Sequence, residues 1–292
     1  DSCDNRRHHG AQGKSGGIGM EWWQALVLGI VQGLTEFLPV SSSGHLMLVR
    51  ELLGVDGEGF LDFTVAVHFA TVVSTVVVFW NVIVDLLKGL LKFKYNDETD
   101  YVCKIAVSMI PVAVVGVFFK DKVEALFGDG VTVVGICLLV TAFLLLLSDF
   151  LTSRLHYVNN YRNGISYWQA LIVGAGQAFA VAPGLSRSGT TIATGLVCGV
   201  KRDRMAQFSF LMVLVPIIGE QALDCLDMIL SPAGETVTSV GAVPLLIGAV
   251  SAFLSGLFAC KVMIAMVKKA KLGWFALYCA AVGAAILIFN AV

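Results

Sequence analysis

The sequence predicts an all-α polytopic membrane protein, with six transmembrane helices and two re-entrant helix hairpins in an inverted-topology repeat. Three observations support this prediction: the composition, six apolar runs of spanning length, and two matching stretches broken by Pro, Gly and Ser. Hydrophobic residues make up 57% and charged residues 14% of the 292 residues, and the mean hydropathy is +0.82. Soluble domains have about 25% charged residues. So few charges are expected of a chain whose surface faces lipid.

The first segment, residues 1–19, lies outside the apolar pattern that begins at Met20. It is polar and Gly-rich, it contains His8 and His9, and it lacks the long apolar core of a signal peptide. We interpret it as a disordered tail or an expression remnant, and we treat 20–292 as a single membrane domain. The net charge of −1 gives no indication of a nucleic-acid partner.

Six apolar runs predict the spanning helices, because a helix needs about 20 apolar residues to cross the hydrocarbon layer. They cover residues 61–86, 103–119, 131–149, 205–225, 241–264 and 272–290. Pro111 and Pro216 lie inside two of these runs, which membrane helices tolerate.

Two further apolar stretches are each interrupted by a polar break. Trp22–Leu38 runs into Pro39–Gly44, and Tyr167–Ala182 runs into Pro183–Gly189, with only a short apolar run after each break. Each stretch could be a short span followed by a surface helix. We favour re-entrant hairpins, because the two stretches match each other.

The match is an internal repeat at a constant offset of 145 residues. Between 24–46 and 169–191, eight of 23 positions are identical without a gap. The identical pairs are Gln24/Gln169, Ala25/Ala170, Leu26/Leu171, Gly29/Gly174, Gln32/Gln177, Ser41/Ser186, Ser43/Ser188 and Gly44/Gly189. Three spans separate the hairpins, which places them on opposite faces. The sequence therefore predicts inverted repeats over about 20–149 and 165–292, with the binding site at the breaks.

Loop charges predict the orientation. Twelve cationic residues fall on one side of this topology: Lys88, Lys92, Lys94, Lys104, Arg154, Arg162, Lys201, Arg202, Arg204, Lys268, Lys269 and Lys271. Three fall on the other: Arg50, Lys120 and Lys122. By the positive-inside rule the first side is cytoplasmic, so both termini and the mouth of the first hairpin face outward.

Ionisable residues at the breaks are functional candidates, because charge inside a membrane is costly. Gln32 and Glu36 are spaced i, i+4 on one helix face, and their oxygens suit Mg²⁺ or Ca²⁺ when substrate phosphate completes the coordination. An interhelical hydrogen-bonded pair is the alternative. Arg187 starts the second half-helix, where a guanidinium and free N–H groups make an anion site. A purely structural salt bridge to Glu36 is its alternative.

The spacing of Ser42 and His45 lets the imidazole draw a proton from the hydroxyl or attack phosphorus itself. His68 and Glu220, inside predicted spans, are open between functional and structural roles. Further hydroxyl side chains at the breaks are candidates for binding the substrate: Ser41, Ser43, Ser186, Ser188, Thr190 and Thr191.

At these motifs the sequence resembles the undecaprenyl-diphosphate phosphatase family associated with bacitracin resistance. The resemblance rests on Gln32–His45 (QGLTEFLPVSSSGH) and Pro183–Thr191 (PGLSRSGTT), with weaker similarity over nearly all of 20–292. It implies hydrolysis of undecaprenyl diphosphate to the carrier lipid of peptidoglycan synthesis, dependence on a divalent metal, and a site open to the outside of the bacterial plasma membrane. Many members have Glu at the position of Gln32, so weaker metal binding is expected here.

The resemblance and the residues agree on an expected mechanism. Glu36 and Gln32 would hold the metal on the diphosphate, Arg187 would neutralise the terminal phosphate, and His45 would activate Ser42 for in-line attack. Whether Ser42 or His45 attacks phosphorus stays open.

Two other classes of protein share parts of this pattern. Lipid phosphatases with an acid-phosphatase signature need a later histidine, and no histidine follows His156. The inverted repeat also suggests a transporter or flippase of an anionic polyprenyl lipid. The sequence leaves open whether the chain also flips lipid, and it indicates neither the oligomeric state nor the physiological metal.

Overall fold

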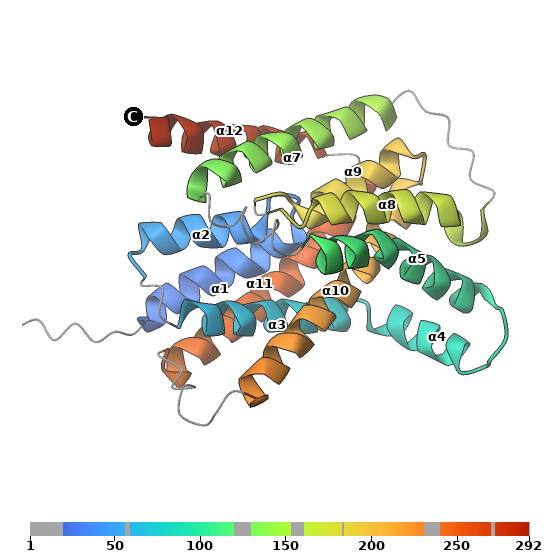
Figure 1. Cartoon of the computed structure of the whole chain (residues 1–292), viewed down its shortest axis with the longest axis horizontal. Coiled ribbons are helices and arrows are strands. Elements are labelled where there is room, and N and C mark those ends of the chain that lie inside the picture. Colours follow the sequence, from blue (N-terminus) through green and yellow to red (C-terminus); the bar gives the residue numbers. More distant parts are fainter. Residues whose placement is uncertain are drawn as a thin grey trace, which may run out of the picture.

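The computed structural model describes residues 20–55, 59–119, 130–152, 161–182, 184–230, 240–269 and 272–291, apart from the side chains of 130, 220–230 and 291. Within this part every regular element is helical, which confirms the all-α class (Figure 1). The elements are α1 (Trp22–Phe37), α2 (Ser42–Leu52), α3 (Phe60–Val78), α4 (Trp80–Leu90), α5 (Asp97–Phe118), α7 (Gly130–Thr152), η1 (Arg162–Gly164), α8 (Tyr167–Phe179), α9 (Arg187–Val197), α10 (Arg202–Leu230), α11 (Ala242–Lys268) and α12 (Leu272–Ala291). The predicted tail 1–19 and the side chain of Glu220 lie outside the described part.

Five described helices are long and apolar enough to cross a membrane: α3, α5, α7, α11 and α12. They correspond to five of the six predicted runs, so the chain is a multi-pass membrane protein. The sixth run, 205–225, lies within α10. The part of α10 with described side chains, 202–219, contains three charged residues at its start. A sixth crossing by α10 stays a prediction.

The run 61–86 forms two helices instead of the single span predicted. Helix α3 ends at Val78, Phe79 has φ −100° and ψ 14°, and α4 begins at Trp80 and packs on α5. The residues around the break are β-branched or aromatic, which favour helix only weakly. They include neither Gly nor Pro, so the sequence carries no breaking signal there.

Tryptophans mark the ends of the helices. Each lies within the first turn of its helix and is 40% to 70% exposed: Trp22, Trp23, Trp80, Trp168 and Trp274. Exposed Trp at helix ends is typical of the interface between lipid and water.

The two broken stretches form short helix pairs. Helix α1 packs on α2 and α8 packs on α9, and each of these four helices has 16 residues or fewer. The second helix of each pair starts at a serine cap: Ser41 Oγ accepts from Gly44 N, and Ser186 Oγ accepts from Gly189 N. Serine caps satisfy the free N–H groups that a helix start leaves behind. In Figure 1 the breaks lie near the middle of the molecule.

The same local contacts recur in both pairs at the offset of 145. Gln24 Nε2 donates to the carbonyl of Leu53 (3.1 Å), and Gln169 Nε2 donates to the carbonyl of Cys198 (2.8 Å). The following glycines, Gly54 and Gly199, have positive φ of 62° and 81°. Gly54 and Gly199 are identical residues at the same offset, and Leu53 and Cys198 make the same contact although they differ, so the repeat extends beyond the stretches 24–46 and 169–191.

The two halves are interlocked through close helix contacts. A Cβ on Gly29 of α1 would collide with the backbone of Gly248 in α11, and a Cβ on Gly174 of α8 would collide with Ser108 in α5. Each helix pair therefore lies against one of the long apolar helices, α1 against α11 and α8 against α5. Helices α7 and α12 pack side by side at one edge of the molecule (Figure 1).

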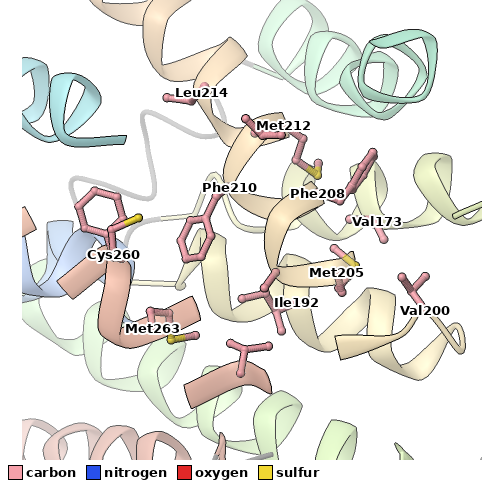
Figure 2. Packing of buried hydrophobic residues seen from close by; sticks show 14 of the residues in the cluster. Val173, Ile192, Val200, Met205, Phe208, Phe210, Met212, Leu214, Cys260 and Met263 are labelled. Atoms are coloured by element: carbon pink, nitrogen blue, oxygen red, sulfur yellow. The ribbon is translucent and has the colours of Figure 1, made fainter. Parts of the chain in front are cut away.

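A continuous apolar core joins the second hairpin to its neighbours. Figure 2 shows Val173 of α8, Ile192 of α9, Phe208 of α10 and Met263 of α11 gathered in one cluster. All four are essentially buried. This packing fixes the start of α9 beside the end of α1, which brings the two breaks together.

Candidate active site

The centre of the site is the carboxylate of Glu36, in the last turn of α1. Its side chain is 9% exposed. Oε2 accepts from Gln32 Nε2 (2.8 Å), one turn earlier on the same helix, and from Ser42 Oγ (2.6 Å), the first residue of α2. The break between α1 and α2 thus folds the Ser42 hydroxyl back onto Glu36. This arrangement unites three of the predicted site residues.

The second hairpin contributes Arg187, the first residue of α9. Its Nη2 atom lies 3.5 Å from Glu36 Oε1, and the side chain is 27% exposed. Ser42 and Arg187 are separated by the repeat offset of 145, so they occupy equivalent positions after the two breaks. The first helical residue after each break, Ser42 or Arg187, therefore lies beside the carboxylate of Glu36.

His68 of α3 joins this cluster, and the sequence reasoning did not place it there. Nε2 lies 3.8 Å from Glu36 Oε2. Nδ1 lies 2.9 Å from the carbonyl oxygen of Thr64. A signal was present in the sequence: Thr64, His68, Thr71 and Thr75 form a polar stripe at helical spacing in an otherwise apolar run. Such a stripe indicates a face turned toward a polar site.

A pocket opens beside these residues and has two chemically different parts. Its polar lining is Glu36, Thr71, Thr75, Arg187 and Ser188. Its apolar lining is Phe37, Val72, Phe210, Val213, Leu214 and Ile217. The lining matches the chemistry of an anionic group with an attached hydrocarbon chain, with the anion at the guanidinium and the chain against the apolar wall.

His45 lies close in sequence but faces another helix. Nδ1 is 2.7 Å from the carbonyl oxygen of Ser41, which can only accept, so Nδ1 carries the proton. Nε2 then accepts from the hydroxyl of Tyr278 in α12 (2.7 Å), and the two rings stack with centroids 5.6 Å apart. Both ring nitrogens have partners, while Ser42 donates to Glu36. The structure does not bring His45 onto Ser42.

The remaining hydroxyl residues mainly hold the breaks. Ser41 and Ser186 are helix caps, and their hydroxyls lie 3.5 and 3.4 Å from those of Ser43 and Ser188. Among them Ser188 lines the pocket.

Two threonines complete this set. Thr191 Oγ1 lies 2.6 Å from Ser209 Oγ and 2.9 Å from the carbonyl oxygen of Arg187, so it ties α9 to α10. Thr190 is buried, and its hydroxyl has no hydrogen-bond partner among the described residues. The Thr191 contacts thus hold the first turn of α9, which begins at Arg187.

A divalent cation is the cofactor predicted from the sequence, and the donor set fits it in part. No group of three His, Cys, Asp or Glu residues in the described ranges could hold a metal. Gln32 is fully buried, however, and its Oε1 has no hydrogen-bond donor among those residues. Mg²⁺ is commonly bound by one or two carboxylates together with substrate phosphates. Glu36 and Gln32 fit such a cation when the substrate supplies the other oxygens.

Comparisons with known proteins agree with this chemistry. A family model described as "Bacitracin resistance protein BacA" matches residues 25–285. A protein of Bacteroides fragilis named undecaprenyl-diphosphatase is 52% identical over 93% of this chain and 99% of its own length. Proteins of the same name from Parabacteroides distasonis and Christiangramia forsetii are 53% and 47% identical, over 90% and 92% of this chain and 96% and 98% of their own lengths.

Proposed function

Because the chain belongs to the BacA family of bacitracin resistance proteins, we propose that it hydrolyses undecaprenyl diphosphate to undecaprenyl phosphate and inorganic phosphate. It is then a membrane hydrolase that supplies the carrier lipid of cell-wall synthesis and confers bacitracin resistance. The observation that carries the proposal is the pocket where Glu36 and Arg187 meet beside an apolar wall. In undecaprenyl diphosphate, the diphosphate matches the polar lining of this pocket and the polyprenyl chain matches its apolar wall. None of the relatives above is named as a transporter, so lipid transport is not proposed.

Arg187 binds the terminal phosphate in this proposal. A guanidinium can donate two parallel hydrogen bonds to phosphate oxygens. The start of α9 adds the positive end of a helix dipole at the same place. Both groups act on the charge that spreads over the phosphoryl oxygens during transfer, which is most of what this reaction requires.

Ser42 attacks the terminal phosphorus. The Ser42 Oγ–P bond forms as the bond from phosphorus to the bridging oxygen breaks, and undecaprenyl phosphate leaves with that oxygen and its electron pair. The Ser42 proton passes to Glu36, whose Oε2 is 2.6 Å away. Water then attacks the phosphoserine, inorganic phosphate leaves, and Glu36 returns the proton to Ser42. Glu36 thereby takes the role of base that the sequence analysis gave to His45.

A bound Mg²⁺ or Ca²⁺ would be held by Glu36 and Gln32, and it would add positive charge at the diphosphate. An ionised carboxylate has about four lone-pair positions, so binding a cation and receiving the Ser42 proton are compatible.

We also propose the topology of six spans and two re-entrant hairpins in inverted repeats, within the bacterial plasma membrane. The recurring contacts of the two helix pairs support the repeat, and the cationic side chains near one end support that end as cytoplasmic. The site then opens outward and both termini face outside.

The direct test is phosphate release from undecaprenyl diphosphate by the purified protein in detergent. We expect turnover by the parent and a loss of at least about 100-fold in Glu36→Gln, because the neutral amide cannot take the Ser42 proton and binds a cation more weakly than a carboxylate does. Removing divalent cations with a chelator should also stop turnover. A folded parent protein without phosphate release would refute the proposed function, and full turnover after chelation would refute the metal.

A further inference from the structure

We propose that His68 is a ligand of the divalent cation bound by Glu36 and Gln32, which gives the cation site one nitrogen donor beside its oxygen donors. The inference rests on the proposed function, because that cation would act on the diphosphate. It adds a side chain from α3 to a site otherwise built from the two breaks.

The distance between His68 and Glu36 suits a shared cation. His68 Nε2 and Glu36 Oε2 lie 3.8 Å apart. Small divalent cations bind nitrogen and oxygen at about 2.0–2.2 Å, so two atoms on one cation lie at most about 4.0–4.4 Å apart. The observed separation is within this limit, and it is too long for a hydrogen bond. The two atoms can therefore bind one cation without movement of either helix.

The ring of His68 is already oriented for a metal. Nδ1 lies 2.9 Å from the carbonyl oxygen of Thr64, which can only accept, so Nδ1 holds the proton and Nε2 presents a lone pair. A hydrogen bond from the second ring nitrogen to a backbone carbonyl is the usual arrangement of metal-binding histidines. His45 makes the same kind of bond to Ser41, but its Nε2 accepts from Tyr278. The nitrogen facing Glu36 is the one that His68 leaves available.

Gln32 completes the donor set. Its carbonyl Oε1 has no donor among the described residues although the side chain is fully buried, while its Nε2 donates to Glu36 Oε2. A half-turn of the amide exchanges these two atoms. The carbonyl oxygen would then lie beside Glu36 Oε2, where a cation needs another oxygen.

The positive charge of Arg187 is compatible with a cation bound to Glu36. Arg187 approaches Oε1 of Glu36, whereas His68 approaches Oε2, so the guanidinium and the cation would bind opposite oxygens of one carboxylate. The diphosphate would lie between them and contact both. Because imidazole favours transition metals over Ca²⁺, this site should discriminate among divalent cations more than an all-oxygen site would.

The test is spectroscopic and uses Mn²⁺ alone as the probe. The chain has five histidines, and replacing His8, His9, His45 and His156 leaves His68 as the sole imidazole. In this four-substitution background, electron spin echo spectra of bound Mn²⁺ should show coupling to one ¹⁴N nucleus. Labelling with ¹⁵N-histidine should change the coupling pattern. The same measurement with His45 restored controls for effects of that substitution.

A second variant measures the contribution to binding. Adding His68→Gln to the background with His45 restored should remove the nitrogen coupling and raise the Kd for Mn²⁺ by about tenfold or more. The Kd for Ca²⁺ should change less. Unchanged coupling in His68→Gln, or no nitrogen coupling in any preparation, overturns the proposal.

Phosphate release and the Mn²⁺ spectra are both measured on the parent protein. Hydrolysis by a parent that lacks nitrogen coupling overturns the role of His68 and leaves the phosphatase intact. Nitrogen-coupled Mn²⁺ in a parent that releases no phosphate overturns the proposed function and leaves the metal site intact.

Discussion

At the scale of single residues, Glu36 receives partners from four helices. Gln32 comes from α1, Ser42 from α2, His68 from α3 and Arg187 from α9. A buried carboxylate is costly unless it is paired and hydrogen-bonded. The hydrogen bonds from Gln32 and Ser42 and the Arg187 guanidinium stabilise its ionised form, which is the form that can orient Ser42 and receive its proton.

Arg187 should be sensitive even to a conservative change. Arg187→Lys keeps the charge but loses the planar pair of donors, and Arg187→Ala loses both. Transition-state clamps of this kind can contribute about 10³-fold or more. We therefore expect Arg187→Lys to lose most turnover and Arg187→Ala nearly all, measured as phosphate release. A folded Arg187→Lys protein with the parent rate would show that Arg187 is structural.

The nucleophile can be identified by trapping the covalent intermediate. Ser42 Oγ points to Glu36 within the site, whereas His45 is held by Ser41 and Tyr278. Mass spectrometry of acid-quenched enzyme should locate phosphate on Ser42, and Ser42→Ala should abolish it. Phosphate on His45 would contradict the assignment.

Tyr278→Phe tests the second contact of His45. It removes the hydrogen bond to Nε2 and keeps the ring stacking. If His45 only anchors α2 to α12, the variant should unfold at a lower temperature and keep its phosphoserine. A loss of phosphoserine without a loss of stability would instead give His45 a chemical role.

At the scale of elements, the hairpins depend on close contact with the opposite half. A Cβ at Gly174 would meet the Ser108 carbonyl of α5, whereas one at Gly116 meets nothing within 4 Å. Gly174→Ala should destabilise the protein by about 1–3 kcal/mol because the helices must separate. Gly116→Ala should be neutral or stabilising by up to about 1 kcal/mol, because Ala favours helix over Gly. Thermal unfolding in detergent compares the two, and equal effects would argue against tight packing of α8 on α5.

The sequence was informative where polarity interrupts an apolar pattern. The breaks and the meeting of Glu36 with Arg187 follow from local composition and from the repeat, whereas Ser41 and Ser186, expected to bind substrate, cap helices in the structure. The polar stripe of α3 marks His68 as facing a polar site, but the partners of His68 and Tyr278 could not be predicted, because they lie on other helices and depend on how α3 and α12 pack. The end of α3 at Val78 was missed because no Gly or Pro marks it.

At the scale of the whole molecule, orientation is accessible to labelling. In a cysteine-free background, a cysteine at exposed Glu51, at the mouth of the first hairpin, should react with an impermeant thiol reagent added outside intact cells. A cysteine at exposed Lys94, before α5, should react only after the membrane is opened. The reverse pattern would invert the topology and place the site on the cytoplasmic side.

The interlocked halves have a consequence for the order of events during synthesis. Helix α1 packs on α11, which begins at Ala242, whereas α1 ends at Phe37. Chains grow at about 5–20 residues per second, so roughly 200 intervening residues correspond to about 10–40 s. During that interval the first hairpin, with Gln32 and Glu36, is in the membrane without its main partner. The newly made amino-terminal half should therefore depend on the insertion machinery until the carboxyl-terminal half arrives.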